Sequence, residues 1–220
     1  MSRLSVHKAI VVGASSGMGR EVARLLLKDG WTVGIVARRG ALLESLAREY
    51  SASVLTNESL AKKPLTDESL VDKPLVDKVG GKVLVREIDV TSSDADSCLR
   101  RLIDEMGGID LYFHAAGVGW QNYSLDKTKE LRTVEVNSLG FARMTGEAFR
   151  YFASVGHGRI AVISSIAGTK GLGPSPAYSA TKAFENIYLQ ALEQQAKTRR
   201  LDIHFTDIRP GFVRTALIDD

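Results

Sequence analysis

Short apolar runs alternate with longer amphipathic stretches along most of this chain. The apolar runs have the length of buried strands and lie at residues 8–12, 31–36, 82–88, 109–114, 159–163 and 202–208. The amphipathic stretches carry apolar residues at helical spacing and lie at residues 17–28, 40–49, 94–105, 128–154 and 177–197. Strands and helices in alternation predict one α/β domain, with helices on both faces of a parallel sheet and right-handed crossovers. Six strands suffice for a doubly wound sheet in the order 3-2-1-4-5-6.

The first predicted strand runs directly into a turn of small residues, Gly13-Ala14-Ser15-Ser16-Gly17-Met18-Gly19, and then into a helix. Small residues let the backbone approach a pyrophosphate closely, and the dipole of the following helix favours its negative charge. A glycine-rich turn alone is often only a tight strand-to-helix connection. Between a buried strand and an amphipathic helix, it predicts a dinucleotide site on a Rossmann-like fold.

Tyr178 and Lys182 stand four residues apart at the start of the last predicted helix, which places the phenol and the ammonium on one face. A tyrosine hydroxyl exchanges its proton near neutral pH only where positive charge favours the phenolate, and a lysine one turn away supplies such charge. Ser165 closes the apolar run 160–165. It therefore follows a predicted strand at its carboxyl end, where open α/β sheets place their sites.

These residues belong to an ordered set of motifs that resembles the classical short-chain dehydrogenase/reductase family over nearly the whole chain. The matching motifs are Gly13-x-x-x-Gly17-x-Gly19, Asp89-Val90, Ala115-Ala116-Gly117, Asn137, Ser165, Tyr178-x-x-x-Lys182 and Pro210-Gly211. Any one of them is weak, whereas the set in this order is highly specific. The resemblance implies an enzyme that interconverts a carbonyl and an alcohol by hydride transfer with a nicotinamide cofactor.

The resemblance assigns catalytic roles to Asn137, Ser165, Tyr178 and Lys182. Tyr178 is expected to donate a proton to the alkoxide formed during reduction, and Ser165 to hydrogen-bond the same oxygen. Lys182 is expected to stabilise the phenolate and to bind the ribose. Asn137 is expected to distort its helix, so that a freed backbone carbonyl holds a water against Lys182.

The end of the second predicted strand indicates which cofactor binds. Rossmann folds that select NAD place Asp or Glu there to bind the ribose 2′-hydroxyl, whereas here Ala37 is followed by Arg38 and Arg39. The Arg38 guanidinium suits a 2′-phosphate, which it could bind through two N–H groups, and Ser15 in the glycine-rich turn could add a hydroxyl to the same phosphate. NADP(H) is therefore expected in preference to NAD(H). The alternative is that both arginines are solvated loop charges.

Further cofactor contacts follow from the resemblance. Asp89 is expected to accept a hydrogen bond from the adenine amine, to lead the turn at residues 91–94, or to do both. Val213 and Thr215 are expected to meet the nicotinamide carboxamide. The full set of expected cofactor-binding residues is Gly13, Ser15, Ser16, Gly17, Met18, Gly19, Arg38, Arg39, Asp89, Val90, Ala115, Ala116, Gly117, Tyr178, Lys182, Pro210, Gly211, Val213 and Thr215.

Three features depart from the family pattern. His114 stands where the family has an asparagine that steadies a turn, and we interpret it as structural. Residues 56–78 contain two copies of a decamer that each end in Pro-Leu. They predict a solvated loop insertion in preference to a partner-binding arm. The chain ends at Asp220, before the family's seventh strand and substrate-covering segment, so an open substrate cleft is expected.

Composition narrows the choice of partners. With 44% hydrophobic and 25% charged residues, the 220 residues fit one globular domain. A net charge of +3 with scattered basic residues does not indicate nucleic-acid binding. The single Cys98 excludes an intrachain disulfide, and the histidines lack metal-ligand spacing, so no metal site is expected. No signal peptide and no apolar run that could span a bilayer are present, so a cytoplasmic location away from membranes is expected.

The expected function is reversible, NADP(H)-dependent reduction of a carbonyl on a small, apolar substrate. Trp120, Tyr123, Leu172 and Phe212 are expected to flank the cleft. The main alternative is an NADP-binding regulator or scaffold without turnover. A sugar-nucleotide epimerase fits poorly, because such enzymes usually carry Gly-x-x-Gly-x-x-Gly. Surplus apolar positions on the helices at 128–154 and 177–197, which members of the family commonly pair, predict a homodimer or homotetramer.

Overall fold

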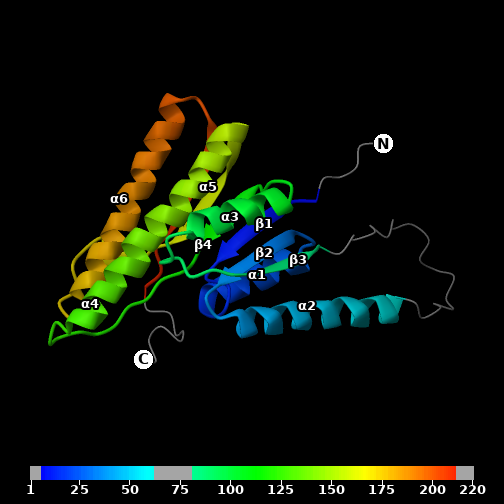
Figure 1. Cartoon of the computed structure of the whole chain (residues 1–220), viewed down its shortest axis with the longest axis horizontal. Helices are drawn as coiled ribbons and strands as arrows, with labels where there is room; N and C mark the ends of the chain where they lie inside the picture. Colours follow the sequence, from blue (N-terminus) through cyan, green and yellow to red (C-terminus); the bar gives the residue numbers. More distant parts are fainter. Residues whose placement is uncertain (1–5, 62–80, 212–220) are drawn as a thin grey trace, which may run out of the picture.

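The protein is built around one parallel sheet (Figure 1). The computed structural model describes residues 6–61 and 81–211. Within these residues the sheet has six strands in the order β3-β2-β1-β4-β5-β6, which confirms the predicted order. The strands are β1 Lys8–Val12, β2 Thr32–Ala37, β3 Val83–Glu87, β4 Leu111–His114, β5 His157–Ile163 and β6 Asp202–Ile208. Each neighbouring pair is parallel. The chain therefore reverses its winding direction at β1, between β2 and β4.

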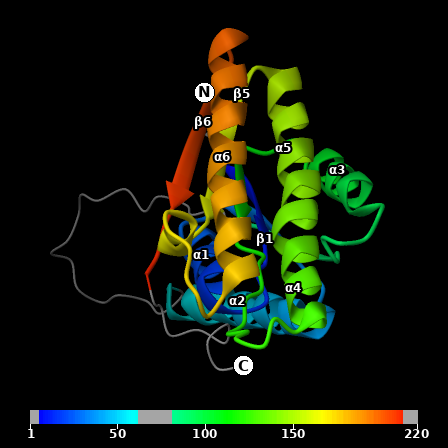
Figure 2. The ribbon, with the colours of Figure 1, turned by 90° about the vertical axis from the view of Figure 1, so that its left-hand side faces the viewer.

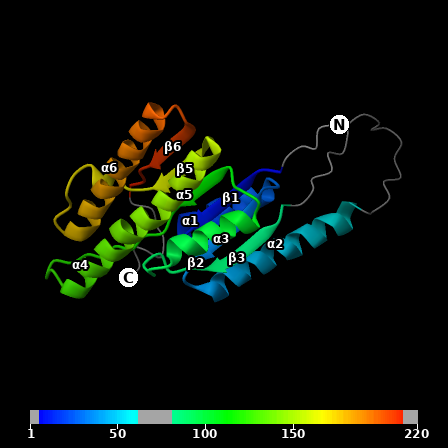
Figure 3. The same ribbon diagram turned by 45° about the horizontal axis from the view of Figure 1, so that its top comes forward.

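Helices connect the strands and cover both faces of the sheet. They are α1 Gly17–Lys28, α2 Gly40–Ala61, α3 Ala95–Glu105, α4 Lys127–Val134, α5 Phe141–Val155 and α6 Pro176–Thr198. A π-helical turn, η1 Glu135–Gly140, joins α4 to α5, and a short 3-10 turn, η2 Ile166–Gly168, follows β5. Figure 2 shows α6 standing beside the rod formed by α4 and α5. Figure 3 shows these three helices toward one edge of the sheet and α2 toward the other.

Alternate residues of the central strand point into two different cores. Ile10 and Val12 pack in the cluster that contains Phe141 of α5 and Leu189 of α6. Val11 packs in a second cluster, with residues of α1 and α2 that include Leu27 and Leu43. A strand that is buried on both faces has a continuous apolar run in its sequence, and that run is the pattern that predicted β1.

Two predicted helices differ from those observed. The helix predicted at 40–49 continues as α2 to Ala61, so residues 56–61 of the expected loop insertion are helical. The single helix predicted at 128–154 is divided by the π-helical turn η1, whose six residues include Asn137. Several predictions fall outside the described residues: residues 62–78 of the insertion, Phe212, Val213 and Thr215. Across the part of the chain that is described, every helix is too short or too polar to cross a bilayer.

Candidate active site

The candidate site lies along the carboxyl edge of four adjacent strands. The register pairs Val12 of β1 with His114 of β4, and Val162 of β5 pairs with both His114 and Asp207 of β6. The segments that follow these strands therefore emerge together: the glycine-rich turn, Ala115–Gly117, Ser164–Ser165 and Pro210–Gly211. An open α/β sheet binds its ligands at this edge, where the winding reverses.

At two positions of the glycine-rich turn the neighbouring backbone is too close to admit a side chain. Gly13 has φ +90°, and a Cβ there would lie 2.5 Å from the backbone nitrogen of Ala116. A Cβ on Gly19 would lie 2.4 Å from the carbonyl oxygen of Gly13. The cap residue of α1, Ser16, makes no side-chain hydrogen bond to the helix. The amides at the start of α1 are therefore left for an anion.

Arg39, rather than Arg38, contacts the glycine-rich turn. Its Nη2 donates to Ser15 Oγ at 2.9 Å and to Ser16 Oγ at 2.7 Å. Arg38 is exposed and acts electrostatically on Asp89. The two arginines expected to bind the phosphate therefore lie in different places: Arg39 on the glycine-rich turn and Arg38 toward Asp89.

Asp89 has the contacts of a turn-leading residue. Its Oδ1 accepts hydrogen bonds from the Thr91 backbone N–H at 3.0 Å and from Thr91 Oγ1 at 2.7 Å. Partial burial raises the pKa of Asp89, but the Thr91 hydrogen bonds and the charges of Arg132 and Arg38 bring it below the ordinary value. Asp89 is therefore an ionised carboxylate fixed at the end of the loop after β3. Its contact to an adenine amine stays a prediction.

Asn137 lies in the π-helical turn, fully buried, and binds the loop after β4. Its Oδ1 accepts from the Val118 N–H at 2.9 Å, and its Nδ2 donates to the Val118 carbonyl at 2.8 Å. Nδ2 also lies 3.2 Å from Thr181 Oγ1 on α6. The side chain thus fixes the loop to α6. The expected helix distortion at Asn137 is present, and the expected water contact stays a prediction.

Tyr178 and Lys182 meet the same loop from the first turns of α6. A Cβ on Gly119 would lie 2.5 Å from the Tyr178 ring, so the ring rests on bare backbone. A Cβ on Gly117 would lie 3.5 Å from both Lys182 Nζ and Asn137 Oδ1. Lys182 Nζ is 5.7 Å from the centre of the Tyr178 ring. These three predicted catalytic residues therefore converge on Gly117–Gly119.

Ser165 is held at the end of β5 as the cap of η2, where its Oγ accepts from the Ala167 N–H at 3.1 Å. Gly168 of η2 packs on the α6 backbone, because a Cβ there would lie 2.7 Å from the Lys182 carbonyl oxygen. The Ile166 N–H donates to the Pro210 carbonyl at 3.2 Å. Ser165 thus lies at the carboxyl end of β5, close to α6 and to the segment after β6.

His114 is buried and partnered by an aromatic hydroxyl. Its Nδ1 lies 2.7 Å from the Tyr112 hydroxyl, and its ring stands edge-on to Phe141 with 5.1 Å between ring centres. Burial, with the charge of Lys182, lowers the pKa of His114 to about 3. The imidazole is therefore neutral, and its contacts are those of a packing residue.

Sequence reasoning missed Glu185, whose side chain is fully buried against Lys182. Both Glu185 carboxylate oxygens lie 2.9 Å from Lys182 Nζ. The signal was present in the sequence, because Glu185 falls on the same helical stripe as Leu189, Leu192 and Ala196, which are apolar and buried. A carboxylate on an apolar stripe needs a buried partner.

The loops expected to flank the substrate lie beside the start of α6. The Asn122 N–H donates to the Pro174 carbonyl at 2.7 Å and so joins the loop after β4 to the loop before α6. Tyr123 and Leu172 are exposed on these loops.

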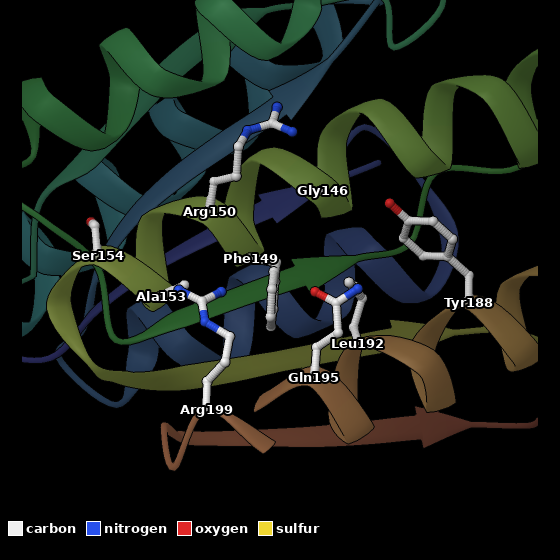
Figure 4. Close-up of a pocket in the computed structure, with 9 residues that line it drawn as sticks. All are labelled: Gly146, Phe149, Arg150, Ala153, Ser154, Tyr188, Leu192, Gln195 and Arg199. Atoms are coloured by element: carbon white, nitrogen blue, oxygen red, sulfur yellow. The ribbon is translucent and has the colours of Figure 1, made fainter. Parts of the chain in front are cut away.

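Figure 4 shows a separate groove between α5 and α6, lined by Gly146, Phe149, Arg150, Ala153, Ser154, Tyr188, Leu192, Gln195 and Arg199. None of the predicted catalytic residues lines that groove. Among the described residues no cluster of His, Cys, Asp or Glu is arranged to hold a metal ion.

Comparison with known proteins agrees with this arrangement. The profile of the short chain dehydrogenase family matches residues 7–73 and 65–220, two pieces that overlap within the duplicated decamers. An uncharacterized oxidoreductase from Myxococcus xanthus is 30% identical over 99% of this chain and 76% of its own length. Actinorhodin polyketide ketoreductase, solved with NADPH, has a TM-score of 0.77 and 26% identity, over 99% of this chain and 74% of that one.

A short chain dehydrogenase/reductase from Burkholderia phymatum, solved with NAD, has a TM-score of 0.79 at 18% identity, over 99% of this chain and 69% of that one. This likeness supports the fold alone. Because the family profile matches most of the chain and the Myxococcus xanthus protein is similar along nearly all of it, the protein belongs to the short-chain dehydrogenase/reductase family of oxidoreductases.

Proposed function

We propose that the protein is an NADP(H)-dependent oxidoreductase that interconverts a carbonyl and an alcohol on a small, apolar substrate. The observation that carries the proposal is the convergence of Tyr178, Lys182 and Asn137 on Gly117–Gly119. This loop continues the turn that packs on Gly13. A proton donor therefore stands next to the dinucleotide site. A regulator that only binds the cofactor has no need of such a donor.

The residues present fit a phosphorylated dinucleotide. Gly13 and Gly19 leave the backbone of the turn bare, and the first amides of α1 have no side-chain cap. These groups would hold the pyrophosphate. Arg39, bound to Ser15 and Ser16, and Arg38 would hold a ribose 2′-phosphate, and Ala37 offers no carboxylate to repel it. Family members are solved with NADPH and with NAD, so the preference for NADP(H) rests on these residues.

The protein's own residues handle the proton. The bound cofactor supplies or accepts the hydride. In the direction of reduction, Tyr178 donates its hydroxyl proton to the substrate oxygen, and Lys182 stabilises the phenolate that results. Ser165 Oγ already accepts a hydrogen bond from Ala167, which leaves its own proton free to donate to the same substrate oxygen. Asn137 keeps the Gly117–Gly119 loop against α6, and it would maintain the water path that returns the proton.

A substrate screen tests the proposal directly. Aldehydes, ketones, quinones and 3-oxoacyl thioesters are offered with NADPH, and its oxidation is followed by absorbance. We expect turnover with at least one uncharged carbonyl compound and none with the corresponding alcohol until NADP replaces NADPH. Tight NADPH binding without turnover across the whole panel would favour the non-catalytic regulator or scaffold.

We propose that residues 56–78 are an insertion that does not contribute to the site. Deleting the second decamer, residues 66–75, is expected to leave cofactor affinity and thermal stability nearly unchanged. The reason is that halving or doubling a surface loop changes the free energy of unfolding by only about 0.6 kcal/mol. Thermal unfolding followed by circular dichroism measures the effect, and a loss of several kcal/mol would show that the segment packs into the fold.

We propose that the protein forms a dimer through α4, α5 and α6. Among the apolar residues of the two predicted helices at 128–154 and 177–197, five are buried in the protein's own core: Val136, Phe141, Phe149, Leu189 and Leu192. Leu139, Phe184 and Ile187 remain exposed, as do Leu131 and Val134 on α4. The exposed set lies on the helices that stand side by side in Figure 2. Exposed apolar residues that gather on neighbouring helices favour association.

Ile187→Glu is expected to shift the protein from dimer to monomer at micromolar concentration, because it places a charge where an apolar contact should form. Light scattering with size-exclusion chromatography measures the change. Leu25→Glu is the matched control, because Leu25 is similarly exposed but lies on α1, on the opposite face of the sheet. A monomeric unmodified protein would refute the dimer.

A further inference from the structure

Glu185 forms an ion pair with the predicted catalytic lysine in the interior of the protein. Its side chain is 0% exposed and that of Lys182 is 5% exposed. Both carboxylate oxygens contact the ammonium at 2.9 Å. Lys182 stands one turn from Tyr178 on α6 and Glu185 stands two turns away. The proposed mechanism uses the charge of the lysine but not the carboxylate.

The pair leaves no donor of Lys182 free among the described residues. An ammonium has three N–H groups. In Lys182 they are matched by the two Glu185 oxygens and by the Ile163 carbonyl oxygen, at 3.2 Å. A ribose hydroxyl or the Tyr178 oxygen must therefore share or displace one of these acceptors. Glu185 thus decides where the ammonium lies and how strongly it acts on its neighbours.

The charges that face Glu185 come from two elements. On its own helix the neighbour is Lys182, and across from it on β6 is Asp207. Asp207 is itself bound by Ser164 Oγ and by Arg209, whose Nε lies 2.6 Å from Asp207 Oδ2. On β4, His114 is neutral and contributes no charge. Burial, against the opposing effect of Lys182 and aided by Asp207, raises the pKa of Glu185 to about 7.

We propose that Glu185 is a positioning residue for the active site: it anchors the Lys182 ammonium beside Tyr178 and, when ionised, offsets part of the positive charge that favours the Tyr178 phenolate. The inference rests on the proposed function, because it assumes that Tyr178 and Lys182 act as the proton-donating pair. It adds that the Glu185 carboxylate weakens the effect of the Lys182 charge on Tyr178. The tyrosine gives up its proton less readily than it would beside an unpaired lysine.

The consequence is a shift in the ionisation of Tyr178. In Glu185→Gln the side chain keeps its shape but loses its charge, so Lys182 acts on Tyr178 without compensation. Glu185 follows Tyr178 by seven residues on α6, roughly 10 Å along the helix axis. A unit charge at about that distance, at an effective dielectric of about 20, changes an ionisation midpoint by about one pH unit. We therefore expect the midpoint of Tyr178 to move about one pH unit toward acid in this variant.

The ionisation of Tyr178 can be measured on the protein without cofactor or substrate. Tyrosinate absorbance near the ultraviolet edge is titrated with pH in the wild type and in Tyr178→Phe, and the difference isolates Tyr178. The same difference is taken between Glu185→Gln and Glu185→Gln/Tyr178→Phe. Glu147→Gln is the matched control, because Glu147 is also a buried, paired carboxylate, but its partners are Arg100 on α3 and Arg150 on α5. The control should leave the Tyr178 midpoint unchanged.

A midpoint lowered by about one pH unit in Glu185→Gln, and restored in Glu185→Asp, supports the proposal. An unchanged or raised midpoint in Glu185→Gln overturns it. If Glu185→Gln does not fold, the double variant Lys182→Met/Glu185→Gln replaces it, because it leaves no unpaired buried ammonium. In this double variant, loss of the Lys182 charge raises the Tyr178 midpoint and loss of the Glu185 charge lowers it. We therefore expect a Tyr178 midpoint within about one pH unit of the wild-type value, and a larger rise overturns the proposal.

These outcomes are independent of whether a substrate or cofactor is found. A protein in which Glu185 acts as proposed, but which turns over no carbonyl compound, would fail as an oxidoreductase and still show the shift. An active enzyme with an unshifted Tyr178 would keep the proposed function and lose the role of Glu185.

Discussion

Tyr178→Phe is expected to lower the turnover number by a factor of about 10²–10⁴, the range that a positioned proton donor contributes. The substitution keeps the ring that rests on Gly119 and removes only the hydroxyl. Cofactor affinity should therefore largely survive, and the protein should stay folded. Steady-state kinetics on any substrate found in the screen, together with fluorescence titration of NADPH, separates the two quantities.

Lys182→Ala should behave differently from Tyr178→Phe. It removes both the charge that stabilises the phenolate and the proposed ribose contact, so turnover and cofactor affinity should fall together. It also leaves the buried Glu185 carboxylate without its partner, so a loss of stability of roughly 3–5 kcal/mol is expected. Near wild-type turnover in Tyr178→Phe would rule out the proposed mechanism, whatever the effect of Lys182→Ala.

The fold was predictable because the inner strands β1, β2 and β4 are short and almost fully buried, and because amphipathic helices separate the strands. The predicted β1 and β6 coincide with those observed, and the strand order follows from the alternation of elements. The end of α2 was not predictable from composition. Residues 50–61 are rich in serine, threonine and asparagine, which favour helices weakly, and yet the helix continues to Ala61.

The sequence predicts which residues make up the candidate site but not the contacts that they make. Spacing placed Tyr178 and Lys182 on one helical face, and strand ends placed Ser165 near them. Which of the two arginines binds the glycine-rich turn depends on the path of the loop after β2, which no local pattern encodes. The partner of Lys182 was missed for another reason: an acidic residue three positions along a helix usually forms a solvated pair. Only burial of the whole stripe brings Glu185 against Lys182 in the interior of the protein.

Arg39→Ala is expected to weaken NADPH binding about 10- to 150-fold and to change NADH binding little, because a charge-assisted contact contributes about 1.5–3 kcal/mol. The guanidinium is already held by Ser15 and Ser16, so little ordering is needed when a 2′-phosphate binds. Arg38→Ala should also erode the preference for NADPH. Its effect is expected to be smaller, since Arg38 lies toward Asp89, whereas Arg39 lies on the glycine-rich turn.

Fluorescence titration of both dinucleotides against each variant measures this preference. Arg24→Ala serves as the control, because Arg24 is an arginine of α1 whose partner is Glu21 on the same helix. Its removal should leave both affinities unchanged. Equal dissociation constants of the unmodified protein for NADPH and NADH would contradict the assignment of the two arginines to a 2′-phosphate. A preference for NADPH that survives Arg39→Ala but not Arg38→Ala would move the phosphate site from the glycine-rich turn to the loop that faces Asp89.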